Sequence, residues 1–167
     1  RAKELNCLYR VDELLGREEA PLDEVLGEVI RTISGGWQFP DVCVSRIVLG
    51  NRVFEPAGFT PTPFRLVSLL EAQGEIAGQV EVYYTEAMPR SVEGPFLAEE
   101  RKLLDAIAER LGHFVSRRRL QRDGTEVREA AQGEGPEGRG LAGEGRDLLE
   151  VRDLRLPPSR AGERGED

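Results

Sequence analysis

Hydrophobic residues recur at steps of three and four between Phe96 and Gln121, which is the spacing of one face of a helix. The residues on this face are Leu97, Leu104, Ile107, Ala108, Leu111, Phe114 and Val115. Acidic residues open the segment and arginines close it, an order that complements the helix macrodipole. We therefore expect a long amphipathic helix over 96–121, introduced by Gly94 and Pro95, against which the rest of the chain packs.

Two shorter segments near the start of the chain show the same helical periodicity. The first, over 2–15, places Leu5, Leu8, Val11, Leu14 and Leu15 on one face. It is either the end of a longer connector or a helix that docks on this domain's own core. The second, over 21–33, starts at Pro21 and ends before Gly35 and Gly36, as helices commonly do.

The middle of the chain has the composition and the turns of an antiparallel sheet. Segments 41–49 and 52–54 flank Gly50-Asn51, which favours a two-residue hairpin turn. Segments 64–71 and 75–85 flank Gln73-Gly74. In the last segment Val80, Val82 and Tyr84 alternate with Gln79, Glu81 and Tyr83, which predicts one core side and one more polar side. Gly78 predicts a bulge or a close backbone approach.

The composition changes after the long helix. Residues 124–167 contain no aromatic residue and are dominated by Gly, Glu, Arg and Pro. Such a segment buries too little apolar surface to offset its ordering entropy. We interpret residues 1–122 as one domain and residues 123–167 as a disordered low-complexity tail, native, truncated or out of frame.

The charge, the hydrophobic runs and the cysteines argue against a nucleic-acid-binding, a membrane-spanning or a disulfide-rich protein. The net charge of −8 disfavours nucleic acid as the main partner, and we interpret the arginines at 117–119 and 122 as a solvated helix end. No run reaches the roughly 20 apolar residues of a membrane-spanning helix. Cys7 and Cys43 are far apart in sequence and suit reduced, buried thiols. We expect a cytoplasmic protein that binds no membrane, metal or cofactor.

Candidate catalytic residues are few. His113 is the only histidine, and we interpret it as a structural residue at or near the surface. Glu99 with Glu100, and Asp41 near Cys43, are interpreted as solvated because neighbouring helix positions point in different directions. The chain has no phosphate loop, no G-x-S-x-G and no H-E-x-x-H. We therefore expect a chain that is not itself an enzyme.

A candidate ligand pocket lies on the polar side of the predicted sheet. It would be lined by Arg46, Arg65, Glu81 and Tyr83, beside Trp37 and Phe59. The alternative is that the charged residues pair with one another across the strands and that Trp37 covers the core.

Several motifs together cover most of residues 1–121. They are ELNCLY (4–9), WQFP (37–40), SRIVL (45–49), VEVYYTE (80–86) and EGPFLAEERKLLDAIAERLG (93–112). As a set they resemble the GAF-like domains found N-terminal to sensor histidine kinases and to proteins resembling phosphoenolpyruvate synthase. The resemblance implies an α+β fold, with an antiparallel sheet flanked by N-terminal helices and a long C-terminal helix. The Asn-Lys-x-Asp-Glu signature of cyclic-nucleotide-binding GAF domains is missing, and no cysteine lies in a tetrapyrrole-attachment context.

Two functional hypotheses from different classes follow. In the first, the chain is a non-catalytic regulatory module that controls a covalently attached output domain, with an unknown small molecule as a candidate ligand. It would form a homodimer through Leu5, Leu8, Leu15, Leu104, Leu111 and Phe114. In the second, it is the N-terminal fragment of a phosphoenolpyruvate synthase-like phosphotransfer enzyme. A ligand-free structural dimerisation module is a third alternative.

Overall fold

A computed structural model describes residues 2–132 of the chain, and this part has the expected α+β fold. Helices and strands follow in the order α1 (Ala2–Leu15), α2 (Leu22–Ile33), the 3₁₀ turns η1 (Ser34–Gly36) and η2 (Pro40–Val42), β1 (Cys43–Leu49), β2 (Arg52–Phe54), β3 (Arg65–Ala72), β4 (Glu75–Tyr84) and α3 (Ala98–Gln132). The four strands form one antiparallel sheet in the order β2-β1-β4-β3.

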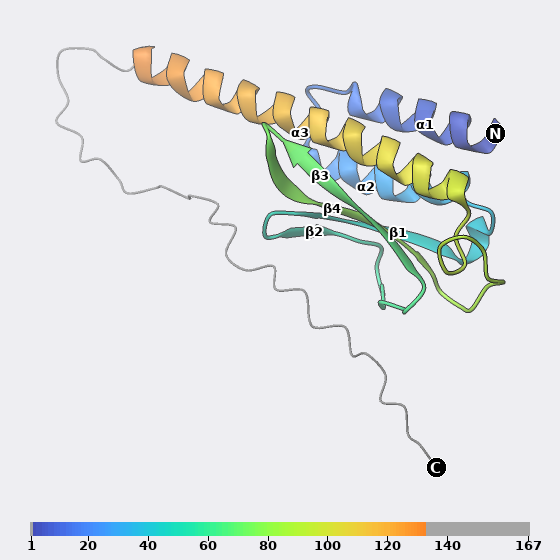
Figure 1. Ribbon diagram of the computed structural model, residues 1–167. Helices are drawn as coiled ribbons and strands as arrows, with labels where there is room; N and C mark the ends of the chain where they lie inside the picture. Colours follow the sequence, from blue (N-terminus) through green and yellow to red (C-terminus); the bar gives the residue numbers. More distant parts are fainter. Residues whose placement is uncertain (1, 133–167) are drawn as a thin grey trace.

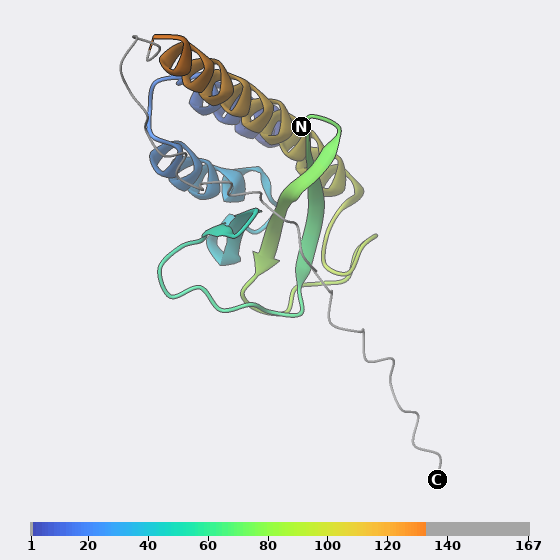
Figure 2. The same ribbon diagram turned by 90° about the vertical axis from the view of Figure 1, so that its left-hand side faces the viewer.

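The helices lie on one side of this sheet, as Figures 1 and 2 show. Helix α2 packs on β1 and β2, and α3 packs on β3 and β4, while α1 packs against both of these helices. We call the helix-covered side of the sheet the inner face and the opposite side the outer face. The arrangement follows from the amphipathic patterns, because each helix has one apolar stripe to bury.

Both hairpin turns form where the sequence predicts them. Gly50 has a φ of 60° and Leu49 pairs with Arg52, as a two-residue turn requires. At the second turn, Gln73 and Gly74 have φ values of 54° and 78°, and Ala72 pairs with Glu75. The two turns set the register of the β1–β2 and β3–β4 pairings, and together with the β1–β4 pairing this register positions the side chains of both faces.

Two glycines mark places where backbones come unusually close. A Cβ at Gly78 would lie 1.9 Å from the carbonyl oxygen of Val48, and the register of β3 and β4 shifts between Leu70 and Glu71 beside it. The predicted bulge or close approach at Gly78 is thus confirmed. At Gly112 a Cβ would lie 2.2 Å from the Glu71 carbonyl oxygen, so this glycine lets α3 approach β3 closely.

The core between the inner face and the helices contains most of the residues that we assigned to a dimer interface. Leu15, Leu104, Leu111 and Phe114 are at most 3% exposed and belong to this core. They are therefore not available at the surface of the protomer, because the apolar stripe of α3 faces the sheet and the neighbouring helices. Of the remaining pair, Leu5 is exposed and Leu8 is half-buried.

Helix α3 differs from its prediction at both ends. It begins at Ala98 and not at Pro95, because Gly94 lies in a turn in which Glu93 and Phe96 form an isolated bridge. It also continues to Gln132, so residues 123–132 are helical and not disordered as the sequence predicts. Most residues between Gly124 and Gln132 are good helix formers, and a single glycine costs a helix only about 1 kcal/mol. The rest of the predicted tail, residues 133–167, lies outside the described residues.

Polar contacts hold α1 and α3 side by side in the same direction. Asp12 of α1 pairs with Arg110 of α3 at 2.8 Å. Further along both helices, Arg118 donates hydrogen bonds to the carbonyl oxygens of Arg17 and Ala20, at 2.8 and 2.7 Å. Arg118, one member of the arginine cluster that we interpreted as solvated, thus fastens the α1–α2 connection to α3.

Within residues 2–132, none of the helices combines the length and the apolar composition that crossing a membrane requires.

Candidate functional site

The outer face of the sheet brings together the four residues of the predicted pocket. Arg46 of β1 lies opposite Glu81 of β4, and Arg65 of β3 lies opposite Tyr83. Because successive side chains of a strand point to opposite faces, Glu81 and Tyr83 share the outer face of β4. The register therefore places Arg46 directly opposite Glu81, and Arg65 at a diagonal position on the other neighbouring strand.

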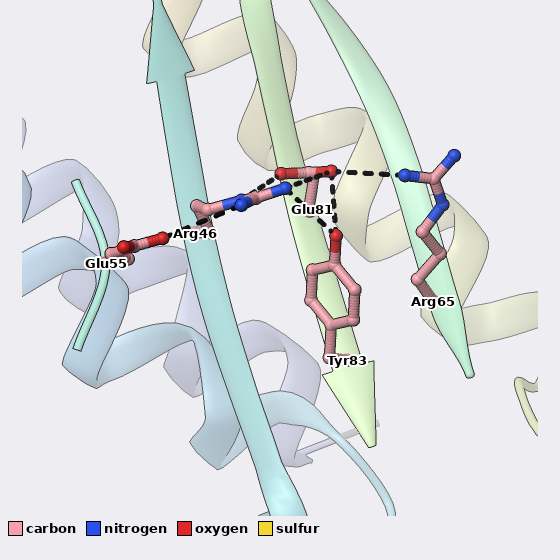
Figure 3. A network of polar contacts seen from close by, with 5 residues as sticks. All are labelled: Arg46, Glu55, Arg65, Glu81 and Tyr83. Atoms are coloured by element: carbon pink, nitrogen blue, oxygen red, sulfur yellow. Dashed lines mark hydrogen bonds and ion pairs between the residues drawn. The ribbon is translucent and has the colours of Figure 1, made fainter. Parts of the chain in front are cut away.

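The centre of this site is a two-pronged ion pair between Arg46 and Glu81 (Figure 3). The Arg46 Nε and Nη2 atoms donate to the two carboxylate oxygens of Glu81, at 2.5 and 3.2 Å. Arg46 Nη2 also donates to the Tyr83 hydroxyl at 3.2 Å, and this hydroxyl donates to Glu81 Oε1 at 3.0 Å. Glu81, whose side chain is 0% exposed, is thus held by two partners in a closed triangle.

Two more charged residues complete what we call the outer-face network, which consists of Arg46, Glu55, Arg65, Glu81 and Tyr83. Arg65 Nη1 lies 3.6 Å from Glu81 Oε1, and Glu55 Oε2 lies 3.6 Å from Arg46 Nη1 (Figure 3). The side chains of Arg65 and Glu55 are 47% and 40% exposed. They are the members of the network that solvent or a ligand reaches most easily.

Glu55 was not among the predicted site residues, although the sequence carries a signal for it. The hairpin around Gly50-Asn51 pairs Leu49 with Arg52 and Ile47 with Phe54. Continuing this register by one residue brings Glu55 beside Arg46. Opposite charges at such cross-strand positions attract each other.

Phe59, from the β2–β3 connection, packs over the network. Its ring meets the Tyr83 ring edge to face with centroids 5.0 Å apart, and the Arg46 guanidinium lies 4.9 Å from the Phe59 centroid. Trp37, which we expected beside this pocket, instead lies fully buried in the core, as the alternative interpretation states. Among residues 2–132, none accepts a hydrogen bond from its indole Nε1.

The electrostatics of the outer-face network favour the charged form of Arg46 beside Glu81. The hydrogen bond to Glu81 raises the pKa of Arg46 above its ordinary value. Burial raises the pKa of Tyr83, and the adjacent Glu81 carboxylate adds to this effect. Tyr83 therefore stays a neutral hydroxyl near pH 7, able to donate to Glu81. The four predicted residues pair with one another across the strands, so a ligand would have to bind at the exposed side of Arg65 and Glu55 or displace an existing partner.

A second buried carboxylate, Glu100, lies at the start of α3 beneath the inner face. Glu100 is 1% exposed, so our interpretation of this residue as solvated is wrong. Its Oε1 accepts from the Leu97 amide at 2.7 Å, and its Oε2 accepts from the Gln38 amide at 3.0 Å and from the Tyr84 hydroxyl at 3.1 Å. The third residue of a helix often reaches back to the N-cap amide in this way, which explains why Glu100 turns inward while Glu99 does not.

Of the other candidate side chains, Cys43 lies near the Glu100 site, because it pairs with Tyr84 in the sheet. His113 is exposed on α3 and lines a surface hollow with Glu71, Glu109 and Ser116. Cys7 and Cys43 are buried free thiols, and burial raises the pKa of Cys7 to about 11. Within residues 2–132, no three His, Cys, Asp or Glu side chains are grouped so that they would hold a metal ion.

Comparisons of the chain with protein families, with curated proteins and with solved structures found no match. The resemblance to GAF-like domains therefore stays a prediction from the sequence motifs.

Proposed function

We propose that this chain is a cytoplasmic, non-catalytic sensory or regulatory module of the GAF-like type, which controls an attached output domain. The observation that carries the proposal is the form of α3. The first part of this helix packs on β3 and β4, and its last part continues past the place where Arg118 binds the α1–α2 connection. At a rise of about 1.5 Å per residue, the helix runs on for about 20 Å beyond that point. A rigid element of this kind can carry a change in the sheet to whatever follows it.

Helix α1 supports the same proposal because it runs beside α3 in the same direction. The contacts of Asp12 with Arg110 and of Arg17 with Arg118 fix this parallel arrangement. A change in the position of one helix should therefore move the other helix as well. In Figure 1 the two helices run side by side along the top of the molecule, and α3 also lies against β3.

The proposed homodimer uses the exposed residues of these two helices and not the buried leucines. Leu5 and Tyr9, one turn apart on α1, are 68% and 72% exposed, and Leu120 on α3 is 61% exposed. Large apolar side chains exposed along neighbouring helices favour association with another helical surface. A second copy of the chain offers such a surface with the same spacing.

The outer-face network is the proposed sensory part. Whether a ligand can reach its charged groups decides between a ligand-binding module and a ligand-free one. Arg65 and Glu55 retain exposed charged groups that a small molecule with an acidic or a basic group would recognise. Conversely, the closed triangle of Arg46, Glu81 and Tyr83 favours the alternative of a ligand-free structural dimerisation module. Thermal-shift screening with nucleotides and central metabolites separates these versions, since stabilisation that is lost in Arg65→Ala supports the ligand.

The dimer itself is tested by analytical ultracentrifugation of the full chain at several concentrations. We expect a dimer that Leu5→Glu weakens by about tenfold or more, because a charge would be buried in the interface. Leu69→Glu is the matched control, since Leu69 is 54% exposed on the sheet and belongs to neither helix. A monomer at all concentrations, or equal effects of the two variants, would contradict the proposal.

A further inference from the structure

Two consecutive tyrosines on β4 connect the outer-face network to the beginning of α3. Tyr83 points to the outer face, where its hydroxyl contacts Arg46 and Glu81. Tyr84 points to the inner face, where its hydroxyl donates to Glu100. Since the two residues are neighbours on β4, a displacement of one ring shifts the backbone to which the other side chain is attached.

Both the ring and the backbone of Tyr84 are held by close contacts, so a displacement of its backbone is passed on to its hydroxyl. Its ring stacks on Phe96 with centroids 4.9 Å apart and meets Phe39 edge to face at 5.8 Å. Its backbone amide donates to the Phe64 carbonyl at 2.9 Å, and its carbonyl accepts from the Thr62 hydroxyl at 2.6 Å. Phe64 and Thr62 belong to the same β2–β3 connection that carries Phe59 over the network, so this connection contacts both tyrosines.

Glu100 is the group on which movements of Tyr84 would act. Its carboxylate joins three separate parts of the fold, namely the segment after η1, the end of β4 and the first turn of α3. A buried carboxylate that loses a donor is left poorly satisfied, because burying a charged oxygen without its hydrogen-bond partner is costly. A shift of the Tyr84 hydroxyl therefore disturbs the bond between Glu100 and the Leu97 amide that closes the start of α3.

We propose that Tyr83 and Tyr84 couple the outer-face network to the first turn of α3, with Glu100 as the receiving group. In this arrangement, removing a hydrogen bond from the outer-face network raises the rate at which the first turn of α3 opens. The biological use of this coupling rests on the proposed function, since it supplies the route from the sensory face to the output helix. The coupling itself is a property of the single chain and can be measured without a ligand or a partner.

Hydrogen exchange of the full chain, followed at the amides of the first turns of α3, tests the coupling. Tyr83→Phe removes only the hydroxyl in the outer-face network. We expect it to speed exchange at the start of α3 by about threefold or more relative to the amides of α2, which report global stability. In a Tyr84→Phe background, where Glu100 has already lost this donor, adding Tyr83→Phe should change the same ratio by less than about 1.5-fold. Leu69→Ala, on the outer face but outside the network, is the control that should leave the ratio unchanged.

Two results would overturn the inference. One is a Tyr83→Phe variant in which α3 and α2 amides accelerate equally, which would mean that the hydroxyl contributes to global stability alone. The other is an equal effect of Tyr83→Phe in both backgrounds, which would mean that Tyr84 does not carry it. If the ratio behaves as expected while ultracentrifugation finds only monomer, the coupling stands and the proposed dimeric relay fails.

Discussion

The two faces of the sheet are built from the same strands but held by different forces. On the inner face, Val80 and Val82 of β4 are fully buried against apolar helix side chains. On the outer face of the same strand, Glu81 and Tyr83 are equally buried, but beneath arginines and an aromatic ring. Burial by itself thus says little about what stabilises a residue. The inner face depends on packing, whereas the outer face depends on hydrogen bonds that must all be made together.

The largest expected loss of stability comes from a substitution that leaves a cavity in the core behind the inner face. Leu104→Ala should lower the free energy of unfolding by about 3 kcal/mol, because Leu104 is fully buried in the core of α3 and the sheet. Leu69→Ala, at a half-exposed position on the outer face, should change it by less than about 0.5 kcal/mol. Urea denaturation of both variants measures the contrast, and similar losses would mean that the two faces are not stabilised differently.

A somewhat smaller effect should follow from opening the outer-face network at its centre. Arg46→Ala leaves Glu81 buried with fewer partners, and we expect a loss of about 2 kcal/mol, less than for a fully enclosed pair because Arg46 is partly exposed. Arg65→Ala should cost less than about 1 kcal/mol, since Arg65 is half exposed and makes only a 3.6 Å contact with Glu81.

Replacing both central charges sharpens this test. The double variant Arg46→Met with Glu81→Met removes the buried charge together with its partner, so it should be more stable than Arg46→Ala alone. Equilibrium unfolding of the single and double variants provides the comparison. A double variant that loses the sum of the single effects would show that the two side chains act independently.

The smallest expected effect concerns a surface pair at the edge of the sheet. Arg101 donates to both carboxylate oxygens of Glu93, at 2.9 and 2.5 Å, and also to the Val67 carbonyl of β3. The hydrogen bonds from Arg101 lower the pKa of Glu93 below its ordinary value of 4.5. A carboxylate with a lowered folded-state pKa stabilises the fold above its unfolded pKa and loses this contribution as the pH falls through the folded value.

Glu93→Gln should therefore cost about 0.5 kcal/mol or less near neutral pH, because the pair is solvent-exposed. The difference between the variant and the wild type should fall toward zero as the pH drops below about 4. Chemical denaturation across this pH range measures it. A difference that grows with acidity would contradict the assignment of the lowered pKa to Arg101.

Local sequence signals predicted much of the fold. The turns at Gly50-Asn51 and Gln73-Gly74, the close approach at Gly78 and the helix over 22–33 each follow from a few neighbouring residues. The pairing of Arg46 with Glu81 was open to prediction because alternation and register place both on one face. Such features depend on geometry that repeats along the chain.

Features that depend on tertiary contacts were harder to predict. The periodicity of Leu104, Leu111 and Phe114 marks an apolar stripe but does not say whether the sheet or a second copy covers it, and here the sheet and helices do. Glu100 has the sequence of a solvated helix start, and only the nearness of Tyr84 and Gln38 shows that it is buried. The length of α3 exceeded the prediction because most residues between Gly124 and Gln132 are good helix formers, and a single glycine does not end such a helix.

The central claim is that the chain pairs through its helical side and passes changes along α3. Cysteine cross-linking of Leu120→Cys in the full chain tests this claim most directly, since Leu120 is exposed on α3 and the native Cys7 and Cys43 are buried. If Leu120 of the two copies meets in the dimer, Leu120→Cys should give a disulfide-linked dimer under mild oxidation, with little product for Leu69→Cys on the sheet or for the wild type. Equal cross-linking of Leu120→Cys and Leu69→Cys, or none for either, would contradict the account.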